Sequence, residues 1–165
     1  MDNPPAQLVY PPSSPAACST LGPGELYPGI HFNWLQDGQV AYFSLRGTRT
    51  TRASVDAWAE AIKTVLIDWP PGQDFFVIQD CSRSGAGPTP YTTGRLREVH
   101  HYYTGKNIYI AVVISKTPIG YLIHAAVNFY RPNDARIAVV YSTDEALRWI
   151  QDIKAVSISA SVINK

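Results

Sequence analysis

Charged residues are scarce in this chain and almost balanced in sign. Only 16% of the 165 residues are charged, and 14 lysines and arginines stand against 13 aspartates and glutamates, for a net charge of +1. Domains that bind nucleic acid usually carry a basic surface, so this balance argues against such a partner. The chain also has ten tyrosines and four tryptophans. A chain with many aromatic residues and few charged ones can have a surface that binds a protein partner, or simply a large hydrophobic core.

Cysteines and long apolar runs are also few. Cys18 and Cys81 lie far apart, in contexts that fit neither a disulfide framework nor a metal site, and a reducing compartment suits them better. The first residues lack the basic region and apolar stretch of a signal peptide, and no apolar run is long enough to span a bilayer. We therefore expect a cytoplasmic protein without a membrane span.

Catalytic and metal-binding motifs are missing as well. The chain has no Gly-x-Ser-x-Gly motif, and Gly85-Ala86-Gly87 lacks the Gly-Lys-Ser/Thr of a phosphate loop. The adjacent His100 and His101 would point about 100° apart on a helix, with no further ligand four positions away. We therefore predict no metal, no cofactor and no catalytic residue, and we expect that the protein is not an enzyme.

Proline is concentrated at the N-terminus. Residues 1–29 contain seven of the 13 prolines, which predicts an extended arm that is neither helical nor central in a sheet. Five apolar residues could anchor this arm on its own domain or on a neighbouring chain: Leu8, Val9, Tyr10, Leu21 and Tyr27. The predicted organisation is thus an arm at 1–29, an α/β domain at 30–154 and a tail at 155–165.

The domain opens with a predicted β-hairpin. Two strand-like runs, at 31–36 and 39–46, are separated by Asp37-Gly38, which is a strong hairpin signal. A helix follows to about Asp68, because Thr50 or Thr51 can cap it and its apolar residues recur at helical spacing.

Strands and helices alternate in the remainder. Apolar runs predict buried strands at 74–80, 107–115 and 136–141, and helices are expected at 91–103, from Thr117-Pro118, and from the capping box at 142–145. This order predicts an α/β fold with a mixed, mainly parallel sheet and four helices. In the tail, apolar residues alternate with serines over 155–163, which could form an edge strand or a segment given to a partner.

Ligands of open α/β sheets bind beyond the carboxyl ends of the strands, and this rule selects the candidate site. The anion or ligand candidates there are Arg46, Arg49, Arg52, Asp80, Ser82 and Thr117. Asp80 is also placed to cap the loop that follows it. The aromatic candidates for an apolar pocket or an interface, if they are not simply core, are Tyr91, Tyr103, Tyr121 and Phe129.

Several segments resemble a known family. They are the hairpin WLQDGQVAYFSLRG, the helix with Trp58 and Trp69-Pro70, the strand FFVIQDCS, the TPY before the second helix, and YSTDEALRWIQ near the end. Over roughly residues 31–153 the chain resembles SpoIIAA-like proteins, relatives of STAS (anti-sigma-factor-antagonist) domains.

The resemblance implies a SpoIIAA-like (STAS-type) fold that often pairs as a homodimer and acts as a non-enzymatic switch. In that family a Ser or Thr at the start of the second helix is commonly phosphorylated, within a DSSG pattern. Here the matching region, 89–94, reads TPYTTG. Thr89, Thr92 and Thr93 are therefore the phosphoacceptor candidates, with helix capping as the alternative role.

Two functions remain open at this point. The first is a non-catalytic regulatory or protein-interaction module that associates with itself as a dimer or larger oligomer. Another protein is a further partner considered for this module. The second is a carrier or sensor of a small molecule. Its ligand would be apolar and lie between the helices at 91–103 and 117–130, or be an anion near Arg49 and Thr117.

Overall fold

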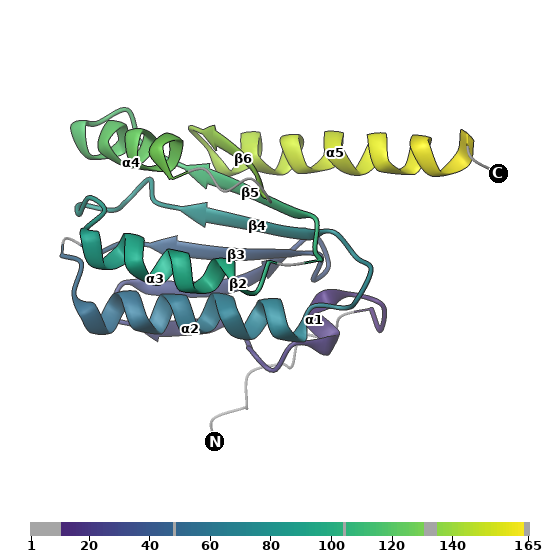
Figure 1. The fold of residues 1–165 in the computed structure, drawn as a ribbon, viewed down its shortest axis with the longest axis horizontal. Helices are drawn as coiled ribbons and strands as arrows, with labels where there is room; N and C mark the ends of the chain where they lie inside the picture. The colour runs from purple at the N-terminus through teal and green to yellow at the C-terminus, as the bar shows by residue number, and fades with distance from the viewer. Residues whose placement is uncertain (1–10, 48, 104, 131–134, 164–165) are drawn as a thin grey trace, which may run out of the picture.

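A six-stranded mixed sheet with helices on both faces forms the core of the molecule (Figure 1). The computed structural model describes residues 11–47, 49–103, 105–130 and 135–163, with side chains up to residue 156. The strands are β1 (Gly24–Tyr27), β2 (Ile30–Leu35), β3 (Val40–Leu45), β4 (Phe75–Asp80), β5 (Ile108–Val113) and β6 (Ala135–Val140). The helices are α1 (Pro15–Cys18), α2 (Arg52–Asp68), α3 (Pro90–His100), α4 (Pro118–Phe129) and α5 (Thr143–Ile163). The predicted α/β class and the mixed sheet are confirmed.

Strands follow one another across the sheet in the order of the sequence. The pairs β1–β2 and β2–β3 are antiparallel, and the pairs from β3 to β6 are parallel. The predicted hairpin is confirmed, because β2 and β3 pair from Ile30 with Leu45 to Leu35 with Val40. Its turn places Gln36, Asp37 and Gly38 at φ 49°, 54° and 81°. A left-handed backbone conformation costs free energy unless the residue is glycine or has a short polar side chain, and Gly38 and Asp37 meet this condition.

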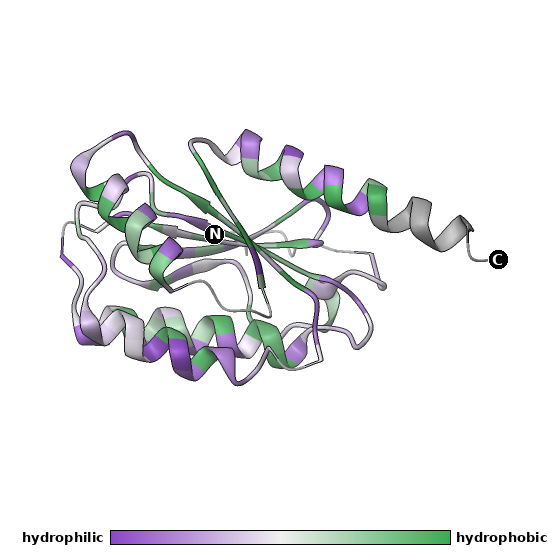
Figure 2. Cartoon of the chain, turned by 45° about the horizontal axis from the view of Figure 1, so that its top comes forward, coloured by the Kyte–Doolittle hydropathy of each residue, from purple (hydrophilic) through white to green (hydrophobic). Residues whose placement is uncertain are grey.

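The crossover helices all cover one face of the sheet. A right-handed connection between parallel neighbours places its helix on a fixed side, and the three crossovers from β3 to β6 run in one direction. Accordingly α2 and α3 pack on one face, whereas α5 packs on the other against β4, β5 and β6 (Figure 2).

The large aromatic residues of the first face gather at the amino ends of the parallel strands. Trp69, which follows α2, lies 4.6 Å from Phe75 and 6.1 Å from Trp34, measured between ring centroids. All three side chains are buried. The space between the helices and the sheet is therefore densely packed with aromatic side chains at the amino ends of the strands. The carboxyl ends lack this aromatic cluster.

Local capping signals set the helix starts. Thr51 accepts a hydrogen bond from the backbone N–H of Ser54 at 3.1 Å, and Thr117 accepts one from Gly120 at 3.2 Å. Ser142 likewise accepts a bond from the N–H of Glu145, whose carboxylate accepts one from the N–H of Tyr141. These three predicted helix starts are confirmed.

The predicted edge strand at the C-terminus is wrong, because residues up to Ile163 continue α5 as a helix. Between the cap at Ser142 and Ile163 the chain has no glycine or proline to end a helix. Extending an existing helix costs far less than starting a new element, so serine alternation alone does not produce a strand here.

The proline-rich arm is also more structured than predicted. It contains the short helix α1, which starts at Pro15, and the edge strand β1, which pairs with β2. Proline suits the first position of a helix, and Pro23 and Pro28 flank β1 without lying in it. The boundary predicted at residue 29 therefore cuts through the sheet.

The arm is anchored on its own domain. Leu21 and Tyr27 pack against the core, as predicted, and the N–H and hydroxyl of Thr20 donate to the Asp68 carboxylate at 2.6 and 2.7 Å. Ala16 is buried, and its N–H donates to the carbonyl of Gly38 in the hairpin turn. The other proposed anchors, at 8–10, lie outside the described residues.

A chain that starts at Ile30 should be less stable, because it loses α1 and β1. Losing the partly buried Leu21, Leu26 and Tyr27 should lower the free energy of unfolding by about 3 kcal/mol. Urea unfolding followed by tryptophan fluorescence measures this difference. The matched control starts at Pro11 and keeps both elements, and an equal loss in that control would show that α1 and β1 are not the cause.

Candidate ligand-binding cavity

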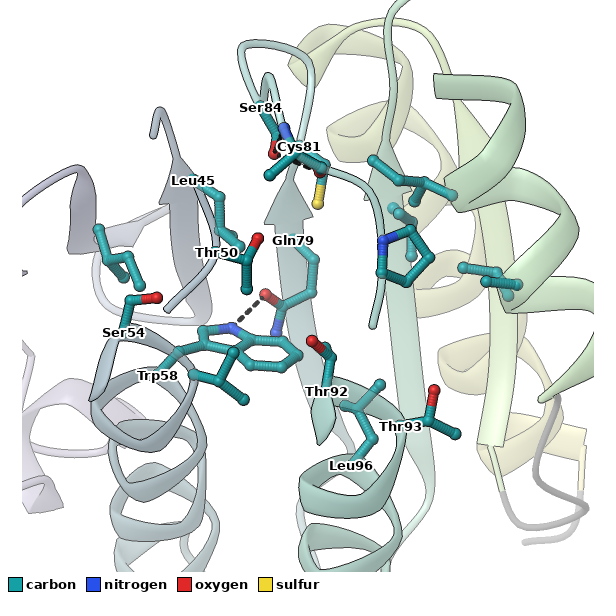
Figure 3. Close-up of a pocket in the computed structure, with 18 of the residues that line it drawn as sticks. Leu45, Thr50, Ser54, Trp58, Gln79, Cys81, Ser84, Thr92, Thr93 and Leu96 are labelled. Carbon is teal, nitrogen blue, oxygen red and sulfur yellow. Dashed lines mark hydrogen bonds between the residues drawn. The ribbon is translucent and has the colours of Figure 1, made fainter. Parts of the chain in front are cut away.

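A cavity of about 200 Å³ lies between α2, α3, α4 and the sheet, in the carboxyl half of the parallel strands (Figure 3). Its exposed lining residues are Pro28, Arg49, Thr50 and Pro88, all on loops at that edge. The cavity therefore opens between these loops. Two of the loops are joined there, because the N–H of Gly85 donates to the carbonyl of Gly47 at 3.1 Å.

The walls of the cavity are mainly apolar. The lining side chains from the helices include Trp58 and Ile62 of α2, Leu96 of α3, and Ile123 and Val127 of α4. The sheet contributes Val77 of β4, Ile110 and Val112 of β5, and Ile137 of β6. An apolar lining with few polar groups is characteristic of sites for small organic ligands.

A hydrogen bond between Trp58 and Gln79 is the central polar feature. The indole Nε1 of Trp58 donates to Oε1 of Gln79 at 2.9 Å, and both residues are buried. Because an indole can only donate, it fixes which end of the amide faces it. The amide nitrogen of Gln79 therefore takes no part in the bond to the indole, and Figure 3 shows this amide among the side chains that line the cavity.

The thiol of Cys81 also faces the cavity (Figure 3). The residue as a whole is partly exposed, but its thiol is enclosed. Burial, together with the nearby charge of Asp80, raises the pKa of this thiol from its usual 9.0 to about 12. Only a thiolate is an effective nucleophile, so Cys81 is chemically inert at neutral pH.

An aromatic group lies at the ends of α3 and α4: His100 is the last residue of α3, and Tyr103 and Tyr130 follow α3 and α4. His100 stacks on Tyr130 with ring centroids 5.1 Å apart, and it lies 4.7 Å from the ring of Tyr103. Burial raises the pKa of the Tyr103 phenol well above its usual value, so this group is neutral. All three residues line the cavity.

Two of the threonine candidates cap α3: the hydroxyl of Thr89 accepts the N–H of Thr92 at 3.1 Å, and Thr92 completes the capping box. Thr93 lies within the helix, where its hydroxyl donates to the Thr89 carbonyl at 3.2 Å. Thr92 and Thr93 also line the cavity.

Among the anion candidates, only Arg49 lines the cavity. The guanidinium of Arg52 lies over the ring of Tyr91 on the outside, and Arg46 is exposed beyond the end of β3. Thr117 caps α4 away from the cavity.

Asp80 and Ser82 form a loop cap that lies outside the cavity lining. The carboxylate of Asp80 accepts bonds from the N–H and hydroxyl of Ser82 at 2.9 and 2.6 Å, which confirms the predicted capping role. Its other oxygen accepts the hydroxyl of Tyr42 at 2.5 Å.

Of the four aromatic candidates, only Tyr103 lines the cavity. Tyr91 donates to the Asp56 carboxylate on the outside of α2, and Tyr121 and Phe129 are exposed on α4. Three lining residues were not among the predicted site residues: Trp58, Gln79 and Cys81. A signal was present for Gln79, because it is the one polar residue within the apolar run 75–79 and shares the inward face with Phe75 and Val77.

No family model, curated protein or solved structure matches this chain. Among the helices described, none is both long and apolar enough to cross a membrane. The described residues contain no group of three histidine, cysteine, aspartate or glutamate side chains that could hold a metal ion.

The two cysteines should differ strongly in reactivity. At pH 8 the raised pKa lowers the thiolate fraction of Cys81 about 1000-fold, so alkylation by iodoacetamide should modify the exposed Cys18 long before Cys81. Mass spectrometry of peptides over time measures both rates, and the unfolded chain in urea is the control. Equal rates in the folded protein would contradict the enclosed, neutral thiol.

Proposed function

We propose that the protein binds a small, largely apolar molecule in the cavity under α4, as a carrier or sensor and without chemical change. The observation that carries this proposal is an apolar cavity of about 200 Å³ at the carboxyl edge of the sheet. Engineered apolar cavities of about 150 Å³ already bind benzene, so the space suits a ligand of one or two rings.

The apolar walls of this open cavity support a binding role. Water contacts these walls when no ligand is bound, and a ligand that covers them would gain about 25 cal/mol for each Å² of apolar surface removed from water.

The chemistry of the lining favours binding over catalysis. Acid–base catalysis needs a titratable group poised near neutral pH and a partner within reach. Among the titratable side chains of the lining, the Cys81 thiol and the Tyr103 phenol are neutral, and His100 has its Nδ1 3.3 Å from the Tyr130 hydroxyl. No carboxylate that could form an acid–base pair with His100 is among the described residues that line the cavity.

Filling the cavity by mutation should abolish binding. Ala126 lines the cavity, whereas its neighbour Ala125 is exposed, so Ala126→Phe and Ala125→Phe form a matched pair on α4. We expect Ala126→Phe to weaken binding of naphthalene at least tenfold and Ala125→Phe to leave it within about twofold of wild type. Isothermal titration calorimetry measures both. Undiminished binding to Ala126→Phe would place the ligand elsewhere and contradict the proposal.

A second candidate function is a STAS-like regulatory module that self-associates. Its support is the resemblance of residues 31–153 and the outer surface of α4, where Tyr121, Leu122 and Phe129 are 55%, 57% and 88% exposed. Neighbouring apolar side chains at this exposure often mark an interface between proteins.

Light scattering tests self-association through this surface. Wild-type protein should have the mass of a dimer or larger, and Leu122→Ser with Phe129→Ser should reduce it to that of one chain. The double variant Ile67→Ser with Val156→Ser removes other exposed apolar side chains and is the control. A monomeric wild-type protein would contradict the self-association proposal and leave the ligand-binding proposal untouched.

A further inference from the structure

A hydrogen-bond donor in the cavity lining indicates which kind of ligand the cavity can bind. Gln79 is 8% exposed, and its Oε1 is taken by the indole of Trp58. Within the described residues the amide nitrogen of Gln79 has no hydrogen-bond partner, although Gln79 lines the cavity. This nitrogen is not one of the fully buried unpaired side-chain atoms, so it is accessible from the cavity, where an acceptor on a ligand can bind it.

An uncharged acceptor suits this part of the cavity. A carboxylate beside Gln79 would lose hydration and would face an amide donor that carries no charge, and the histidine of the lining, His100, has its Nδ1 3.3 Å from the Tyr130 hydroxyl instead. The arginine of the lining, Arg49, is exposed at the opening of the cavity. A ketone, ester, amide or ether oxygen bears no such penalty.

We infer that the ligand is a neutral apolar molecule with one oxygen acceptor, which accepts a hydrogen bond from the amide nitrogen of Gln79. This inference rests on the proposed function and deepens it. The Trp58–Gln79 bond then acts as a positioning device, because it holds the amide with its nitrogen toward the ligand before the ligand arrives.

Three probes of one shape separate the possibilities: indane, 1-indanone and indane-2-carboxylate. Indane is a hydrocarbon, 1-indanone adds a carbonyl, and the third probe adds a negative charge. For the full-length protein we expect calorimetry to show 1-indanone binding about tenfold more tightly than indane, and the carboxylate more weakly than either.

The variants are compared by the ratio of their affinity for 1-indanone to their affinity for indane. A change in cavity size alters both affinities and largely cancels in this ratio, so the ratio reports the hydrogen bond. The double variant Trp58→Phe with Gln79→Met removes the donor without leaving an unpaired indole, and its ratio should fall to one or below. Trp58→Phe alone keeps the amide donor but removes the bond that orients it, so its ratio should lie between those of the wild type and the double variant. If circular dichroism shows that the double variant does not fold, Gln79→Glu keeps the acceptor for Trp58 and should lose the preference at pH 8.

Three other results with these probes would each refute a different part of the proposal. Equal binding of indane and 1-indanone to wild type would refute the acceptor inference while supporting the apolar binding site. Tighter binding of the carboxylate would refute the neutral ligand class. Failure of all three probes to bind would overturn the proposed function together with this inference.

Discussion

The order of the parallel strands is the constraint on which the rest of the molecule depends. From β3 to β6 each strand is added beside the last in the same direction, so α2, α3 and α4 must share one face. The other face is left to α5, which extends to Ile163 (Figure 1). The distribution of large residues decides which end of this helical layer is densely packed. Trp34, Trp69 and Phe75 close the amino end, and the cavity lies toward the carboxyl end.

The position of α4 follows from one glycine. A Cβ on Gly120 would lie 1.9 Å from the carbonyl oxygen of Ser115, so only glycine lets the first turn of α4 approach the end of β5 this closely. Gly120 is also the one fully buried residue of that helix. Beyond it, Ile123, Ala126 and Val127 line the cavity and remain partly exposed. The helix is thus held firmly at its start and stands over the cavity for the rest of its length.

The features that were predicted correctly depend on neighbouring residues in the sequence. The features that were not predicted depend on contacts between distant segments or on the extension of a helix. The Asp37-Gly38 turn and the caps at Thr51 and Thr117 are encoded within a few residues, so the sequence alone revealed them. The pairing of β1 with β2 and the continuation of α5 depend on contacts and on helix propagation, which composition does not show. The strand-end rule selects the edge of the sheet at which the cavity opens. It selected Asp80 and Ser82, which form a loop cap instead, because the rule does not say on which face of a strand a side chain lies.

The two candidate functions meet on α4, which has apolar side chains on both sides. Its inner residues contact any ligand in the cavity, and its outer residues Tyr121, Leu122 and Phe129 form the candidate interface. A ligand that binds one position of α4 more tightly than another must shift the helix toward that position. A partner on the outer surface that distinguishes the same positions would then gain or lose affinity by the same factor as the ligand does. If both functions hold, the protein is therefore a sensor, since the helix that carries the interface is also a wall of the cavity.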